Sequence, residues 1–390
     1  MHDSRSSMSS RPAIAPHAPH AARAAGEWEG RSVLAQARAL ATACTLACAA
    51  LALPGRPAAA AVDFGAGVAT TYDDNYLDYS NRDLFQFQYR LNPTRYGVKT
   101  TDDLVIASYV DATWMPESTH SSLAARLETN KYATNDVRDN LKASVQWRAH
   151  LSPRWRWTLS GAYLPRYYVR RYVDYDLRTP YPSLSRYRDA QYRQADAAVS
   201  AEWRPSGGWR DQLGYTFSRR DFLEAFPERD QSRHQVRLVV RPPHHGPVAA
   251  RLHGSTGWEL ARGPQGLPGN GAPDVSTQSL GAGLLLDWTP TLRGHAASLR
   301  QAVNYETRRY TTPDAGDTGR FGRSVHQFDV GWQLALKFSK HWEAVAAYDL
   351  VRERLTGPLS NVANFTDAGT YHRNRVTAGI SWASRGAGEQ

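Results

Sequence analysis

The sequence has little of what an ordinary soluble core or a helical membrane bundle requires. Its 390 residues include only two cysteines, three methionines and five lysines. Beyond the N-terminal region no apolar run approaches 18 residues, which excludes a bundle of transmembrane helices. Cys44 and Cys48 both lie near the start, so the rest of the chain has no thiol for a disulfide or a zinc–thiolate site.

What the chain does contain is aromatic residues and arginine. There are 12 tryptophans and 20 tyrosines, although only 41% of residues are hydrophobic and the mean hydropathy is −0.57. Because lysine is so scarce, arginine supplies nearly all of the formal net charge of +10. The apolar surface is therefore aromatic and interrupted, which is unusual for a soluble globular domain.

The N-terminus is typical of an export signal. Residues 39–53 form an uncharged apolar run that follows Arg31 and Arg38, and small residues at 58–61 offer a cleavage site. We therefore assign residues 1–61 to a signal peptide with an extended leader, although a membrane anchor and lipidation at Cys48 are alternatives. Removing this segment deletes six arginines and three acidic residues, which lowers the net charge to about +7.

From residue 62 onward apolar side chains recur with a period of two, which predicts β-strands. The clearest case is 325–338, where Phe328, Trp332 and Leu336 share one face and Gln327, Asp329 and Lys337 the other. Fifteen candidate strands result: 62–72, 84–91, 104–114, 122–132, 141–149, 155–165, 195–203, 209–218, 234–241, 248–260, 280–288, 297–309, 325–338, 342–350 and 374–382.

Connections between these strands alternate between short and long. Bacterial outer-membrane barrels have even strand numbers, short periplasmic turns and longer external loops. Tryptophans gather near the short turns, as an aromatic girdle at a membrane interface requires. The predicted girdle is Trp147, Trp155, Trp157, Trp203, Trp209, Trp288, Trp342 and Trp382.

An all-β, closed antiparallel transmembrane barrel of 14 or 16 strands explains this pattern. Every backbone N–H and C=O must be paired in hydrocarbon, and only a closed sheet leaves no edge. We expect the barrel to occupy 62–383, in the outer membrane, followed by a tail at 384–390. The alternative is a soluble β-protein with a tryptophan core.

The chain resembles the porin-like outer-membrane barrels of proteobacteria, and in particular the β-barrel porin type 2 group. The local motif is Thr70-Thr71-Tyr72-Asp73-Asp74-Asn75, a strand that runs into a tyrosine and acidic-asparagine turn. The strand at 377–382 is similar to the signal read by the barrel-assembly machinery, although Ser384 stands where a second aromatic is expected. The resemblance implies a porin-like channel.

On each predicted strand, the residues that alternate with the apolar ones are the candidate lumen-facing residues. Charged lumen side chains set ion selectivity in other pores. An arginine-rich wall predicts hydrophilic, anionic solutes or acidic polysaccharide as cargo, whereas simple pairing of each arginine with an acid is an equal alternative. The candidate selectivity residues are Arg210, Arg220, Arg237, Arg251, Glu259, Arg300, Glu306 and Arg308.

Other chemistry is weakly supported. His253 and Ser255 share a strand face, as in an outer-membrane phospholipase, but we expect them to face the lumen, with no third catalytic group. The pair His244-His245 and the cluster Asp73, Asp74, Asn75 and Asp78 lack the spacing of metal sites. We therefore expect no enzyme activity, no metal and no cofactor.

Two function classes remain open. The first is a channel for passive or export passage of hydrophilic solutes. The second is a structural or interaction barrel with a blocked lumen, whose long loops at 174–188 and 261–276 bind a partner. Lipopolysaccharide phosphates are expected partners of loop arginines, and nucleic acid is not expected. The loop arginines are Arg166, Arg170, Arg171, Arg186 and Arg188.

Overall fold

The computed structural model describes a single antiparallel sheet. The described residues are 61–91, 93–116, 120–173, 187–223, 226–244, 246–262, 275–292, 295–312, 321–357 and 370–384, and all lie in one compact unit, Ala59–Gln390. Its long strands are β1 (Ala61–Asp73), β2 (Asp103–Met115), β3 (Ser121–Tyr132), β4 (Asn140–Ser152), β5 (Trp155–Val173), β6 (Tyr187–Trp203), β7 (Arg210–Leu223), β8 (Gln231–Arg241), β9 (Val248–Ala261), β10 (Thr277–Trp288), β12 (His295–Tyr310), β13 (Ser324–Lys337), β14 (Trp342–Thr356) and β15 (Tyr371–Ala383). The two-residue β11 (Thr291–Leu292) pairs only with the start of β12.

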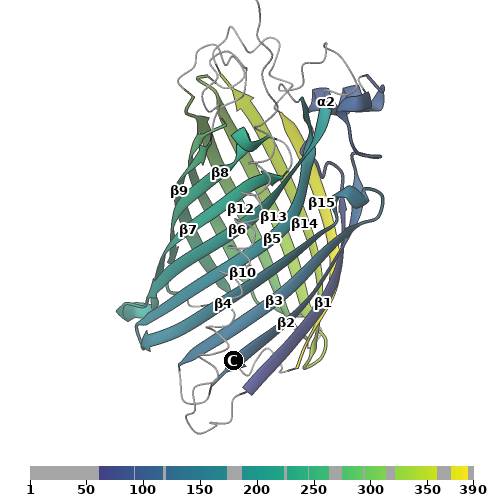
Figure 1. Ribbon diagram of the computed structural model, residues 1–390. Coiled ribbons are helices and arrows are strands. Elements are labelled where there is room, and N and C mark those ends of the chain that lie inside the picture. Colours follow the sequence, from purple (N-terminus) through teal and green to yellow (C-terminus); the bar gives the residue numbers. More distant parts are fainter. Residues whose placement is uncertain are drawn as a thin grey trace, which may run out of the picture. The chain divides into compact units, whose positions relative to one another are not determined.

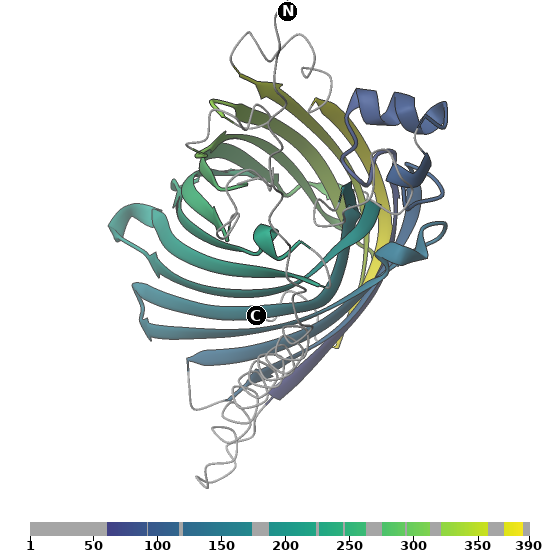
Figure 2. The ribbon, with the colours of Figure 1, turned by 45° about the horizontal axis from the view of Figure 1, so that its top comes forward.

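The sheet closes on itself. Each strand pairs with the next along the chain, β10 pairs directly with β12, and β15 pairs with β1 in the register Ala69↔Gly379. Figure 2 shows the strands curving around a common axis. The result is the predicted closed barrel, with 14 strands, and no described strand is left with a free edge in the wall.

Fourteen of the fifteen predicted strands are confirmed, and one is wrong. Residues 84–91 were expected to be a strand, but Asn81–Gln88 form the helix α2. The side chain of Ser80 accepts a hydrogen bond from the Asp83 backbone N–H at 3.1 Å, which caps the helix. The alternation of Phe85 and Tyr89 with polar residues mimics a strand, yet in the helix these two rings meet one turn apart, with centroids 4.5 Å apart.

Short and long connections lie at opposite ends of the barrel (Figure 1). One end carries the short turns, including the 3₁₀ turn η4 (Ser206–Gly208) between β6 and β7. The other end carries α2 and three further 3₁₀ turns, η1 (Pro93–Arg95), η2 (Asp136–Arg138) and η5 (Pro227–Arg229). The predicted sorting of connections is therefore confirmed by the ends of the flanking strands, although most of the residues in four of the long connections, 174–186, 263–274, 313–320 and 358–369, lie outside the described residues.

The largest cluster of buried apolar side chains is at the long-loop end. Tyr76, Leu77, Tyr79, Tyr96 and Tyr168 are each at most 7% exposed and pack together. In the part of the chain that the structure describes, no helix is long and apolar enough to cross a membrane.

Candidate functional site in the barrel lumen

The register divides the side chains of every strand between an outer and an inner face. On β7, Leu213 and Tyr215 are outward and pair with Leu238 and Val236 of β8, and all four belong to the outer apolar surface. The intervening Gln212 and Thr216 are inward. This alternation places apolar residues outside and polar residues inside, the reverse of a soluble sandwich.

All eight tryptophans of the predicted girdle take outward positions close to the short-turn end. Trp155 stacks on Trp203 across β5 and β6, with ring centroids 6.2 Å apart, and Trp342 is opposite Trp382 on β14 and β15. Trp114 of β2 lies in the same belt and was not predicted. The eight are Trp147, Trp155, Trp157, Trp203, Trp209, Trp288, Trp342 and Trp382.

A second group of outward aromatics lies toward the long-loop end. Tyr72, Trp258 and Tyr305 are 42–46% exposed, and the wall between the two groups carries exposed aliphatic side chains such as Val110 and Leu252. An apolar band flanked by aromatic girdles is the exterior of outer-membrane barrels, because indole and phenol rings favour the headgroup region. The protein is an outer-membrane β-barrel.

The inner face carries all eight predicted lumen residues. Arg210 and Arg220 are inward on β7, and Arg237 on β8. The inward residues of β9 and β12 complete the set: Arg251, Glu259, Arg300, Glu306 and Arg308. His253 and Ser255 also face the lumen, and no hydrogen bond joins their side chains.

Ion pairs hold four of these eight charged residues in fixed ladders. Arg251 and Arg300 both bind Asp287 of β10, the second at 2.8 Å. Arg308 donates to Glu353 of β14 at 2.6 Å and lies 3.7 Å from Glu306. Nearer the short-turn end, Glu202 of β6 is 2% exposed and accepts from Arg156 (2.6 Å), Arg204 (2.8 Å) and Arg241 (3.3 Å).

Three of the predicted arginines remain outside these ladders. Neither Arg210 nor Arg237 makes an ion pair with any described residue. Arg220 also lacks a carboxylate partner and donates instead to the amide oxygen of Gln194 at 2.8 Å. Glu259 accepts from Gln231, in the amide orientation that also satisfies Arg220. The lumen thus combines structural ion pairs with cationic groups that are available to solutes.

Charge is distributed unequally around the lumen. The inward positions of β7–β10 and β12, here called the arginine wall, carry three acids, Glu259, Asp287 and Glu306. They carry eight arginines: Arg210, Arg220, Arg233, Arg237, Arg241, Arg251, Arg300 and Arg308.

The inward positions of β1 and β2, here called the aspartate wall, carry four aspartates and no basic residue. In a ring of 14 strands β1 is opposite β8 and β2 is opposite β9, so the aspartate wall faces the arginine wall across the lumen. The electric field of these charges therefore points across the lumen, from the arginine wall toward the aspartate wall. The four aspartates are Asp63, Asp73, Asp103 and Asp111.

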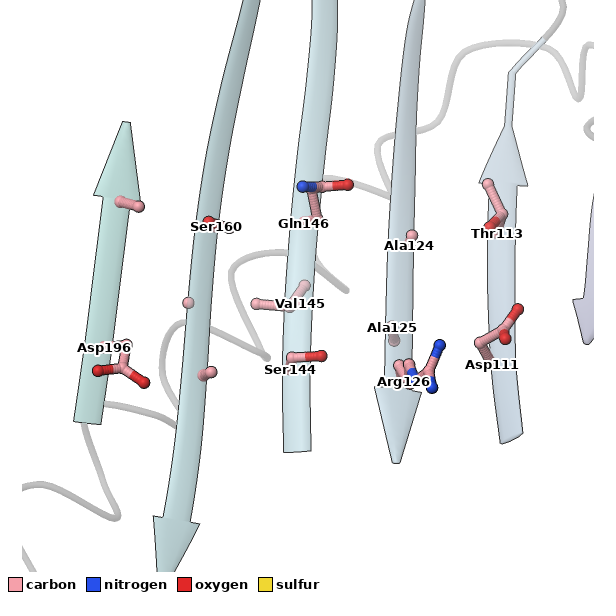
Figure 3. A pocket seen from close by; sticks show the side chains of 13 residues that line it. Asp111, Thr113, Ala124, Ala125, Arg126, Ser144, Val145, Gln146, Ser160 and Asp196 are labelled. Atoms are coloured by element: carbon pink, nitrogen blue, oxygen red, sulfur yellow. The ribbon is translucent and has the colours of Figure 1, made fainter. Parts of the chain in front are cut away.

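A concavity of about 330 Å³ lies on the inner wall from β2 to β6. Figure 3 shows Asp111 on β2 at one side and Asp196 on β6 at the other, with Ser144 and Ser160 between them. Small side chains leave this part of the wall hollow. Sequence analysis did not single out these residues, because they come from five strands and form no local motif.

The motif that carried the family resemblance forms a tight turn at the long-loop end, here called the mouth turn (residues 74–80). Asp74 accepts hydrogen bonds from the backbone N–H (2.7 Å) and side-chain amide (2.6 Å) of Asn374 on β15. Asn75 is 2% exposed; its amide donates to the carbonyls of Tyr79 (2.8 Å) and His372 (3.2 Å). These side chains serve as internal hydrogen-bond partners, as expected for a polar loop.

Arginines from three elements hold the tip of the mouth turn. Arg373 of β15 donates to Asp78 at 2.5 Å, and Arg170 of β5 donates to the carbonyls of Leu77 (2.9 Å) and Asp78 (3.3 Å). Arg138 of η2 donates to the carbonyl of Tyr76 at 2.7 Å. Since four strands separate β15 from β5 in the sheet, the turn spans a chord of the barrel mouth and narrows it.

The predicted loop arginines are placed differently from expectation. Arg166, Arg170 and Arg171 belong to β5 rather than to a loop, because β5 extends to Val173 through two register shifts. Arg171 donates to Asp189 of β6 at 2.8 Å, and Arg188 lies in β6. Arg186 lies outside the described residues, as does His245. Among the described residues, no three His, Cys, Asp or Glu side chains form a group that could hold a metal ion.

No known protein family and no curated protein matches the chain. Solved structures that it resembles include a bacterial polysaccharide outer membrane secretin, with 11% identity over 83% of this chain and 98% of that one and a TM-score of 0.45. An anion-selective porin from Comamonas acidovorans has 10% identity over 83% and 99%, with a TM-score of 0.38. OccAB4 of Acinetobacter baumannii has 8% identity over 84% and 100%, with a TM-score of 0.39. Such likeness carries no argument about cargo, and membership of the porin type 2 group stays a prediction.

Proposed function

We propose that the protein is an outer-membrane channel for hydrophilic solutes, with a preference for anions. A barrel of 14 strands is too wide for its inward side chains to fill, so its lumen holds water. The single observation that carries the proposal is the pair of lumenal guanidinium groups, Arg210 and Arg237, that no described carboxylate neutralises. Fixed positive charge in a low-dielectric wall raises the local concentration of anions.

The transverse field supports the same proposal. An anion that follows the arginine wall passes eight arginines and three acids, whereas the aspartate wall opposite repels it. Export of acidic polysaccharide along this wall is a finer version of the proposal. It requires the lumen to admit an extended polymer past the mouth turn.

A blocked barrel is the alternative that a specific observation favours. The mouth turn is tied to β5 and β15 by Arg170 and Arg373, and its tyrosines pack into a buried cluster. If this cluster sealed the lumen, the protein would act through its external surface.

Planar-bilayer recording separates the two. Purified barrel that inserts and carries current supports the channel, and insertion without current supports the blocked barrel. In a salt gradient, Arg210→Ser/Arg237→Ser should move the reversal potential toward cation preference. The matched control is Arg309→Ser/Arg352→Ser, which removes the same two positive charges from exposed outward positions of β12 and β14. Equal shifts in both variants would remove the lumenal arginines from the proposal.

We further propose that lipopolysaccharide phosphates bind the outer wall rather than the predicted loop arginines. Arg309, Arg352 and Arg354 are exposed and outward on β12 and β14, toward the long-loop end. None of the three makes a hydrogen bond or ion pair with a described residue. Replacing all three with serine should reduce lipopolysaccharide retained on purification, while Arg210→Ser/Arg237→Ser should not.

Two further expectations remain proposals. The first is that the barrel-assembly machinery recognises β15, which ends in Trp382 and closes the barrel against β1. The second is that the lumen carries no catalytic centre. In support of this, His253 makes no hydrogen bond to any described aspartate or glutamate. Lipase and esterase assays on folded barrel would test the second.

A further inference from the structure

The concavity between β2 and β6 is lined by two rows of directly opposed inward residues and by Ala125, Val145 and Gly161 of the row between them. One row runs Asp111, Arg126, Ser144, Ala162, Asp196 across five strands. The neighbouring row runs Thr113, Ala124, Gln146, Ser160, Ala198. These ten residues are here called the shelf. Adjacent strands lie about 4.8 Å apart, so the shelf extends about 19 Å along the wall.

The shelf is hollow because its middle consists of small side chains. Ala124, Ala162 and Ala198 leave an apolar floor, and Ser144 and Ser160 add hydroxyl groups to it. Gln146 and Thr113 supply further donors and acceptors. A volume of about 330 Å³ is within the range of sites for small molecules. A ring with C–H groups on one face and hydroxyls on its edge fits such a floor.

The two ends of the shelf are negatively charged. Asp111 makes no ion pair with any described residue, and Asp196 receives only the amide of Gln194, at 2.8 and 3.0 Å. The one cation in the shelf is already neutralised, because Arg126 lies 3.4 Å from Glu128 and 3.7 Å over the ring of Tyr109. The shelf therefore offers two open carboxylates with hydroxyl and amide groups between them (Figure 3).

We propose that the shelf is a binding site for hydroxyl-rich solutes that carry amino groups, of the class of short amino-sugar oligomers. Ammonium groups would bind Asp111 and Asp196, and ring hydroxyls would bind Ser144, Ser160 and Gln146. Because the shelf lines the lumen, it would add a cationic class of solute to a channel that otherwise prefers anions, and only its role in transport rests on the proposed function. It differs from the anion path, which follows the arginine wall of β7–β10 and β12.

The test uses two trisaccharides with the same ring backbone and different charge. Glucosamine trimer carries ammonium groups, whereas the fully N-acetylated trimer is neutral. Calorimetric titration of folded barrel in detergent should give binding of the glucosamine trimer and at least tenfold weaker binding of the acetylated one. Asp111→Asn and Asp196→Asn should each weaken the glucosamine trimer by about fivefold, as expected for solvated ion pairs.

Asp329→Asn is the matched control. Asp329 is inward on β13 and receives the amide of Gln327 two residues before it (3.0 and 3.1 Å), the same local arrangement as Gln194 and Asp196. It should leave binding unchanged. Ser160→Phe fills the shelf without altering its charge and should abolish binding. This variant keeps the shelf site testable if an aspartate variant fails to fold.

The outcomes separate the two proposals. Equal binding of both trimers, or equal weakening by Asp329→Asn, would overturn the shelf site. Failure of Ser160→Phe to affect binding would also overturn it. Because calorimetry does not need ion flow, binding to the shelf in a barrel that carries no current would refute the channel and leave the shelf site intact.

Discussion

Arg373 donates a 2.5 Å hydrogen bond to Asp78, and this contact fixes the tip of the mouth turn against β15. Asp78 has a φ of 53°, in the left-handed region that non-glycine residues rarely adopt. The same residue offers its carbonyl to Arg170 of β5 at 3.3 Å. One aspartate thus links two strands that have four other strands between them in the sheet, and the mouth is narrowed as a result.

Loss of this link should widen the mouth. Asp78→Asn removes the charge that Arg373 faces, and we expect the mouth turn to be destabilised by about 1 kcal/mol, because the pair is partly solvated. Single-channel conductance should rise and become noisier. The control is Asp102→Asn; its carboxylate accepts only from the exposed Tyr72 hydroxyl, at 3.0 Å. Unchanged conductance in Asp78→Asn would mean that the turn does not limit flow.

Alkaline pH should open the same region. Burial raises the pKa of Tyr79 and of Tyr96 to about 12, and it raises the pKa of Tyr76 as well. The ordinary value is about 10, so the folded cluster keeps its protons at a pH where an open one loses them. The stabilisation is complete below pH 10 and is lost between pH 10 and 12, at about 1 kcal/mol per pH unit for each phenol.

Tyrosinate absorbance and conductance, followed together against pH, would check this. We expect a late-titrating group of tyrosines whose ionisation coincides with a rise in conductance. Tyr79→Phe should shift the transition to higher pH, since it removes one titrating group and a buried hydroxyl that has no hydrogen-bond partner among the described residues. Titration of every tyrosine near pH 10 would contradict the prediction.

The sequence predicts the barrel well because a membrane wall imposes a strict local rule. A strand such as β13 must alternate apolar and polar residues along its length, and that alternation is visible without a structure. The arginines of β7–β12 were placed on the correct face for the same reason. The assignment failed at α2, where three aromatics alternate by chance and the Ser80-x-x-Asp83 capping signal was overlooked.

The sequence could not predict which charges are free or which wall is hollow. Arg237 and Arg251 look alike in the sequence, but only Arg251 meets a carboxylate, Asp287 of the next strand. The shelf depends on registers across five strands, and a shift by one residue in any of them would remove it. These are long-range relationships, for which alternation carries no information.

The cluster of three arginines around Glu202, near the short-turn end, should be important for stability. Three arginines share the carboxylate of Glu202, a residue that is 2% exposed, so Glu202→Gln leaves them without a counter-charge. We expect the free energy of unfolding to fall by about 1–3 kcal/mol, as for a buried polar group that loses a charged partner. Urea unfolding followed by heat-modifiable gel migration measures it. Glu343→Gln, at an inward position of β14 without an ion pair to a described residue, should have little effect.

The close approach of β1 and β2 depends on glycine. The ring of Tyr109 on β2 lies directly over Gly67 of β1, where even a Cβ atom would overlap it. Such covering of a strand glycine by a neighbouring aromatic helps to fix register.

Gly67→Val should therefore displace Tyr109 and, with it, the Arg126 guanidinium that stacks on the ring at 3.7 Å. We expect a loss of about 1–3 kcal/mol, the usual cost of overpacking, and a smaller fraction of heat-modifiable barrel in the outer membrane. Tyr109→Ala combined with Gly67→Val removes the overlap and should restore part of the folded fraction. If the double variant folds no better than Gly67→Val alone, the defect does not arise from this contact.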